Sequence, residues 1–118
     1  MTPDGEGAEQ PDFVVSDGRG RTATPAVTAA VVPALRGMGF QVSVNDPYTG
    51  GTIVKRLGAP DRGVHSVQIE INRALYMDER RFERSATFGR LAADLEALAD
   101  CLAAIPLQEL RPYRAAAE

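Results

Sequence analysis

The sequence of 118 residues contains one cysteine, Cys101, one histidine, His65, and no tryptophan. One cysteine excludes an internal disulfide and fits a reducing compartment, so we expect a cytoplasmic location. A catalytic zinc ion usually takes three protein ligands, drawn mostly from His, Glu, Asp and Cys. The usual paired spacings, His-x-x-x-His and His-x-x-Glu, do not occur in the sequence. We therefore expect no metal ligands in this chain.

Long apolar runs and an excess of basic side chains are also missing. The longest apolar stretch, 29–35, is much too short to span a bilayer. Thirteen basic against 16 acidic side chains give a formal net charge of −3, without the basic footprint of a nucleic-acid-binding protein. The chain does not open with a charged and then apolar leader. We therefore expect neither binding to a membrane or nucleic acid nor secretion.

The composition that is present fits one small α/β domain. A hydrophobic content of 44% and a charged content of 25% are ordinary for a globular protein. Residues 1–11 are polar and rich in glycine and proline, which predicts a disordered leader. Residues 12–105 alternate strand-like and helix-like patterns and form the predicted domain. Residues 106–118, which start at a proline, are predicted to be a weakly ordered tail.

A β-α-β unit is predicted near the start of this domain. Residues 13–15 form a short β-prone run, and residues 40–44 alternate apolar and polar side chains. Between them, apolar residues recur at helical spacing after Thr24-Pro25, a good helix start. A unit of this length predicts two parallel strands joined by a right-handed crossover.

Two further elements are predicted in the second half. Residues 64–71 alternate as a strand does, which places Gln68 and Glu70 on one face and His65 on the other. From residue 88 to residue 105, apolar side chains recur at steps of three and four, which predicts an amphipathic helix. A lone histidine is more often structural than a ligand, and strand parity separates it from Glu70.

Glu70 is the first candidate for chemistry, and its position has two interpretations. A glutamate on a buried strand face, two residues from Gln68, is a candidate general base that deprotonates a bound water. The alternative is an ordinary ion pair or an exposed strand face, which is common in sheets. Spacing alone favours this alternative.

The loop 45–51, with the sequence NDPYTGG, is the second candidate. Gly50 and Gly51 allow backbone amides to approach a ligand closely, and Asn45 is suited to orient a carbonyl or carboxylate. The alternative is a plain turn, because Asn, Asp, Pro and Gly are common turn residues. Arg73 is suited to bind a carboxylate through its bidentate guanidinium, or is simply solvated.

Three segments together resemble the N-formylglutamate amidohydrolases, also called N-formylglutamate deformylases. They are the loop NDPYTGG, the Gly-x-Pro turn at Gly58, and the run GVHSVQIEINRALYMDE that begins at Gly63. The resemblance extends from about Asp12 to near Ile105. The family is similar in fold to zinc carboxypeptidases, which implies part of a three-layer mixed sheet with flanking helices. Its activity is the hydrolysis of N-formyl-L-glutamate to formate and L-glutamate, at the end of one histidine-degradation route.

The resemblance also implies roles for particular residues. Glu70 matches the catalytic glutamate that takes a proton from the attacking water and passes it to the leaving nitrogen. Matches to substrate-binding positions are Asn45, Gly50, Gly51, Gln68 and Arg73. Zinc is the implied cofactor, although its ligands are not expected in this chain. The implied partner is a small N-formyl amino acid substrate, and the departure of residues 52–57 from the family pattern leaves the preferred one open.

Members of the family are more than twice this length, and their zinc ligands lie in the amino-terminal half. We therefore expect a carboxy-terminal portion of such a hydrolase that is inactive alone. Three alternatives remain open: a complementing subunit whose second chain supplies the zinc site, a non-catalytic interaction module, and a non-functional gene fragment. In a fragment, an exposed sheet edge would promote self-association.

Overall fold

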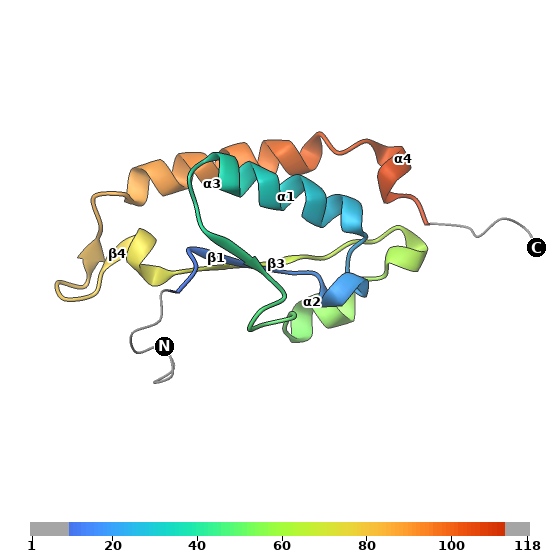
Figure 1. Ribbon diagram of the computed structural model, residues 1–118, viewed down its shortest axis with the longest axis horizontal. Coiled ribbons are helices and arrows are strands. Elements are labelled where there is room, and N and C mark those ends of the chain that lie inside the picture. Colours follow the sequence, from blue (N-terminus) through green and yellow to red (C-terminus); the bar gives the residue numbers. More distant parts are fainter. Residues whose placement is uncertain (1–9, 113–118) are drawn as a thin grey trace, which may run out of the picture.

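The computed structural model describes residues 10–112 (Figure 1). Residues 1–9 of the predicted leader and 113–118 of the predicted tail lie outside this range. The α-helices and β-strands are β1 (Phe13–Ser16), α1 (Pro25–Gly37), β2 (Val42–Val44), α2 (Thr52–Leu57), β3 (Gln68–Ile71), β4 (Met77–Asp78), β5 (Glu83–Arg84), α3 (Phe88–Ala103) and α4 (Leu107–Leu110). Short 3-10 turns are η2 (Gly18–Gly20), η3 (Pro60–Arg62) and η4 (Arg73–Leu75).

A mixed sheet forms the centre of the fold, in the order β2-β1-β3. β1 and β2 are parallel and are connected by α1, so the predicted β-α-β unit is confirmed. β3 runs antiparallel to β1. Parallel and antiparallel pairs in one sheet with packed helices define an α/β fold, in agreement with the predicted class.

The third strand is shorter than predicted, because β3 begins only at Gln68 rather than at residue 64. Gln68 is paired with Ser16, the last residue of β1. Residues 64–67 therefore lie beyond the end of β1, where the sheet offers no strand to pair with. Val64 instead forms an isolated bridge with Ala59 across the turn η3.

The helices α1 and α3 lie side by side over one face of this sheet (Figure 1). The extent of α3 confirms the predicted amphipathic helix. The hydrophobic core lies between the two helices and the sheet, and its buried members include Phe13, Val15, Val31, Leu35, Leu91 and Leu98. Alternation along β1 places Phe13 and Val15 in this core, and the intervening Val14 faces the other way.

The opposite face of the sheet is polar. We call it the polar face, and it is formed by Val14, Ser16, Ser43, Gln68 and Glu70. The strand registers place Ser43, Val14 and Glu70 in one row across the three strands. The short helix α2 lies on this side of the sheet, away from α1 and α3 (Figure 1).

The sequence did not predict two elements. β4 and β5 pair as a small antiparallel hairpin, and α4 forms a helical turn at the start of the predicted tail. Leu110, the last residue of α4, packs against the core. No helix among the residues described is long and apolar enough to cross a membrane.

Candidate functional site

The loop 45–51 lies at the end of the sheet where β1 and β2 finish and β3 begins. These ends meet because β3 runs antiparallel to the other two strands. The hydroxyl of Ser16 donates to the carbonyl of Tyr48 at 2.6 Å, and the amide of Gly18 donates to the carbonyl of Thr49 at 2.8 Å. The residues that follow β1 therefore hold the middle of the loop.

Asp17 and Asn45 form the next attachment, through a reciprocal pair of hydrogen bonds. The side-chain amide of Asn45 donates to Asp17 Oδ1 at 2.7 Å, and the backbone amide of Asp17 donates to Asn45 Oδ1 at 3.0 Å. Asn45 has φ of 53°, in the left-handed region, which asparagine tolerates better than most residues. The side chain predicted to orient the substrate is thus already engaged within the protein.

Asp17 is a buried carboxylate, with 6% of its surface exposed. Its Oδ2 accepts from the hydroxyl of Thr28 at 2.5 Å, and its Oδ1 also accepts from the amide of Gly20 at 3.1 Å. Burial raises the pKa of Asp17, but the hydrogen bonds from Thr28, Asn45 and Gly20 together hold this pKa below its ordinary value. The sequence alone does not single out this residue, because it lies in a glycine-rich segment typical of solvated turns. A usable signal was its place two residues after the apolar run 13–15.

The structure brings Gln68 together with Gly51. The side-chain oxygen of Gln68 accepts a hydrogen bond from the amide of Gly51 at 3.0 Å. Gly50 has φ of +126°, and a β-carbon at this position would lie 2.7 Å from Val54 Cγ2 of α2. The loop therefore requires glycine at position 50, where the chain packs closely against Val54, the buried residue of α2.

Glu70 is exposed on the polar face, opposite Val14 of β1. It lies two residues from Gln68 along β3, about 7 Å on the same face. No ion pair between the described residues includes Glu70. The structure thus shows an exposed strand face, one of the two interpretations of the sequence, and leaves this carboxylate accessible, two residues along β3 from Gln68, which bonds the glycine loop.

Arg73 lies away from the loop. β3 starts at the loop with Gln68 and runs away from it, so Arg73, two residues after the end of β3, lies near the other end of the sheet. Its Nε lies 3.4 Å from Glu79 Oε1, and both side chains are more than half exposed. The structure does not bring Arg73 together with the other predicted substrate-binding residues, because strand direction, which the sequence does not reveal, separates them.

His65 has a structural environment. Its Nδ1 accepts a hydrogen bond from the amide of Thr24 at 3.1 Å, so its Nε2 carries the proton and donates to the carbonyl of Leu110 at 2.7 Å. Both ring nitrogens are thus occupied. Among residues 10–112, no three His, Cys, Asp or Glu side chains are grouped closely enough to hold a metal ion. These residues do not fit a zinc site.

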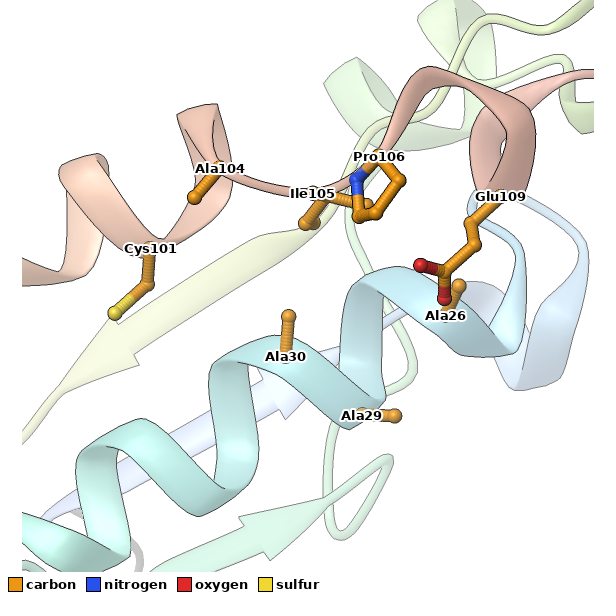
Figure 2. Close-up of a pocket in the computed structure, with 8 residues that line it drawn as sticks. All are labelled: Ala26, Ala29, Ala30, Cys101, Ala104, Ile105, Pro106 and Glu109. Carbon is orange, nitrogen blue, oxygen red and sulfur yellow. The ribbon is translucent and has the colours of Figure 1, made fainter.

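Two hollows of the described surface lie elsewhere. One is a groove of about 280 Å³ between α1 and the end of α3, lined by Ala26, Ala29, Ala30, Cys101, Ala104, Ile105, Pro106 and Glu109. Figure 2 shows these side chains. Most of these side chains are small and apolar, and none belongs to loop 45–51. A second hollow, of about 570 Å³, is lined by residues that include Thr24, Pro60 and Gln108, and likewise by no residue of the loop.

Comparisons of this chain with known proteins identify its family. The family model of N-formylglutamate amidohydrolase matches residues 1–77. The chain therefore belongs to the N-formylglutamate amidohydrolase family, which confirms the resemblance. It is 36% identical over 73 residues to an N-formylglutamate deformylase of Pseudomonas aeruginosa, across 59% of this chain and 27% of that protein.

A solved structure supports the same family. The crystal structure of an N-formylglutamate amidohydrolase from Ralstonia eutropha JMP134 superposes with a TM-score of 0.74 and 37% sequence identity. The superposition covers 87% of this chain and 35% of that one. The chain thus spans between about a quarter and a third of the length of these two relatives.

Proposed function

We propose that this chain forms the substrate-binding portion of an amidohydrolase that cleaves N-formyl-L-glutamate to formate and L-glutamate. Membership of the family supports the reaction class. The observation that carries the proposal is the bond from Gly51 to Gln68 at 3.0 Å. It joins the glycine loop to the strand that bears Glu70, so an amide-rich loop and an accessible carboxylate share one face.

Hydrolysis of a formamide needs a base for the attacking water and an acid for the leaving nitrogen. In our proposal, Glu70 accepts the proton of the water as the oxygen attacks the formyl carbon. The oxyanion of the tetrahedral intermediate then reforms a carbonyl as the C–N bond breaks, and the protonated Glu70 gives this proton to the departing nitrogen. The products are the free amine of glutamate and formic acid, which ionises to formate at neutral pH, and Glu70 is again a carboxylate. The amide of Gly50 and the side-chain nitrogen of Gln68 orient the substrate beside this carboxylate, because the Gly51 amide and the Gln68 side-chain oxygen already bond to each other.

No step is assigned to zinc, because the residues described do not form a ligand set. We propose that any zinc site of the enzyme, and the carboxypeptidase-like surroundings that the resemblance implies, are provided by polypeptide outside residues 10–112. From this we expect the purified 118-residue chain to bind N-formyl-L-glutamate weakly without hydrolysing it.

Binding is tested first, with the full chain. Titration of the isotopically labelled protein with N-formyl-L-glutamate should shift the backbone amide signals of Gly50, Gly51 and Gln68. The variant Gln68→Ala should weaken these shifts, whereas Asp78→Asn, in the distant β4–β5 hairpin, should not. Shifts confined to another surface, or an absence of binding, would contradict the proposal.

Catalysis is tested in a chimera. The matching third of the Ralstonia eutropha relative is replaced by this chain, and formate release is measured. In an active chimera, Glu70→Gln should lower kcat by roughly 10²–10⁴-fold, the usual contribution of a general base, with little change in KM. Full activity of the Glu70→Gln chimera would remove Glu70 from the mechanism.

A second candidate is a non-catalytic module that binds the product. The lack of a fitting zinc-ligand set among residues 10–112 favours it, and so do the outer edges of β2 and β3, which have no strand partner in the described part of the chain. Such edges suit pairing with a second polypeptide. A module of this kind would bind L-glutamate as tightly as N-formyl-L-glutamate, and its chimera would stay inactive.

A further inference from the structure

The carboxylate of Asp17 is placed where a charge is costly. Only 6% of the residue is exposed, and an unpaired charge at such a site would be strongly unfavourable. Its two oxygens accept hydrogen bonds from Thr28 of α1, from the amide of Gly20 and from the side chain of Asn45. These bonds come from three separate segments, so Asp17 joins the helix, the turn after β1 and the loop.

The bond to Asn45 is the one that reaches the candidate site. Asn45 is the first residue of loop 45–51, and its φ of 53° sets the direction in which the loop leaves β2. Its side-chain oxygen accepts from the amide of Asp17 at 3.0 Å and from the amide of Arg19 at 3.4 Å. Its side-chain nitrogen donates to Asp17. Both ends of the Asn45 amide are thus held by the segment after β1.

The later contacts of loop 45–51 show why the backbone direction at Asn45 matters. The middle of the loop is held through Tyr48 and Thr49, and its end through the bond from Gly51 to Gln68. A change in direction at Asn45 would displace all three contacts, because they follow within six residues. The orientation of the glycine amides relative to Glu70 therefore depends on the Asp17–Asn45 pair.

We propose that Asp17 is a positioning residue, which acts through Asn45 to hold loop 45–51 against the polar face in the conformation that binds substrate. The inference rests on the proposed function for the identity of the ligand, an N-formyl amino acid. It also revises the expected role of Asn45, which holds the loop and does not orient the substrate.

The test uses a pair of substitutions at the two partners in the full chain. Asn45→Asp keeps the shape of the side chain but places a second carboxylate 2.7 Å from Asp17, where two negative charges repel. Asp17→Asn removes the first charge and retains a side chain of the same shape. The double variant D17N/N45D restores a donor opposite an acceptor between the two side chains, but the new nitrogen at position 17 then faces the Gly20 amide, which Asp17 Oδ1 accepts in the wild type. Asp78→Asn is the matched control, because Asp78 Oδ1 also accepts two backbone amides, in the distant hairpin.

Two quantities are measured for each variant: hydrogen exchange of the Gly51 amide and the Kd for N-formyl-L-glutamate. We expect N45D to speed the exchange and weaken binding about 10–100-fold, the scale of a lost charge-assisted hydrogen bond. D17N/N45D should recover part of both losses, because the bond from Gly20 is not restored, and D17N alone should have a smaller effect. A double variant no better than N45D, or additive single effects, would overturn the inference.

The two measurements separate this inference from the proposed function. A wild-type chain that binds no N-formyl-L-glutamate contradicts the proposed function, whereas Gly51 exchange still reports on the positioning. If N45D alone does not fold, folding of D17N/N45D is the expected rescue. If neither variant folds, Thr28→Val is tested instead, because it removes a donor to Asp17 from outside the loop. This variant should still speed the hydrogen exchange of the Gly51 amide. Unchanged exchange would refute the role of Asp17.

Discussion

Gly58 lies directly against the backbone of Thr22. A β-carbon at Gly58 would lie 2.5 Å from the carbonyl oxygen and 2.6 Å from the β-carbon of Thr22. Thr22 has little freedom to move, because its carbonyl accepts from the amide of Ser66 and its hydroxyl donates to the carbonyl of Ser66, each at 2.8 Å. The end of α2 is thereby packed onto the segment that leads into α1.

Substitution Gly58→Ala should therefore destabilise the domain. Overpacking of a rigid site costs about 1–3 kcal/mol, and in a domain of this size each kcal/mol lowers Tm by roughly 4–8 °C. Thermal unfolding followed by circular dichroism measures the effect. Gly89→Ala in α3 is the matched control, because a β-carbon at Gly89 would meet no heavy atom within 4 Å beyond its own helix. The control should melt at or above the wild-type temperature, and equal melting of both variants would contradict the packing argument.

Substitution His65→Ala should loosen two distant parts of the chain at once. The imidazole bonds the amide of Thr24 at the start of α1 and the carbonyl of Leu110 at the end of α4. Loss of both bonds should lower the free energy of unfolding by about 1–3 kcal/mol. Urea denaturation measures this free energy, and hydrogen exchange of the Thr24 amide should become faster. If His65 were instead a metal ligand, its substitution would lower zinc affinity and leave exchange at Thr24 unchanged.

The regular elements could be predicted from the sequence where a periodic pattern decides the structure. Alternation in 40–44 and helical spacing in 88–105 arise from burial of one face, so β2 and α3 followed from side-chain type alone. The start of β3 could not be predicted in this way. It depends on the place where β1 ends, at Ser16, and pairing partners are not visible in the pattern of a single strand.

The candidate site was predictable only in part, for a related reason. Gln68 and Gly51 were both proposed as substrate-binding residues, and the structure shows that they bond to each other, a pairing that depends on the fold. Arg73 was proposed with them for its guanidinium and its match to a family position, but β3 runs away from the loop. Asp17 was overlooked because turn residues have the same composition whether they are solvated or buried, and only the fold shows which side chains surround them.

The hydrogen bonds to Asp17 predict how stability depends on pH. The pKa of Asp17 is lower in the folded state than in the unfolded chain, so the unfolded state binds more protons between these two values. The stabilisation is therefore fully present above the unfolded pKa of about 4 and is lost as the pH falls through the folded pKa. Urea denaturation should show that the wild type has a higher free energy of unfolding than Asp17→Asn at pH 7, and that this difference becomes smaller below about pH 4. A difference that is constant down to about pH 2.5, or one that Asp78→Asn reproduces, would contradict this assignment.

The two adjacent glycines of the loop should respond differently to the same substitution. Gly50→Ala forces a φ of +126° on alanine and places its β-carbon 2.7 Å from Val54 Cγ2, so the loop must change conformation to accept it. Gly51 has an extended backbone with φ of −90°, and its β-carbon would lie 3.2 Å from Gln68 Oε1, the end of a flexible side chain. We expect Gly50→Ala to weaken binding of N-formyl-L-glutamate at least about tenfold, which corresponds to about 1.4 kcal/mol, and Gly51→Ala to weaken it less. Chemical-shift titration of both variants measures the difference, and an equal or reversed order would show that the loop does not bind the substrate through its present backbone conformation.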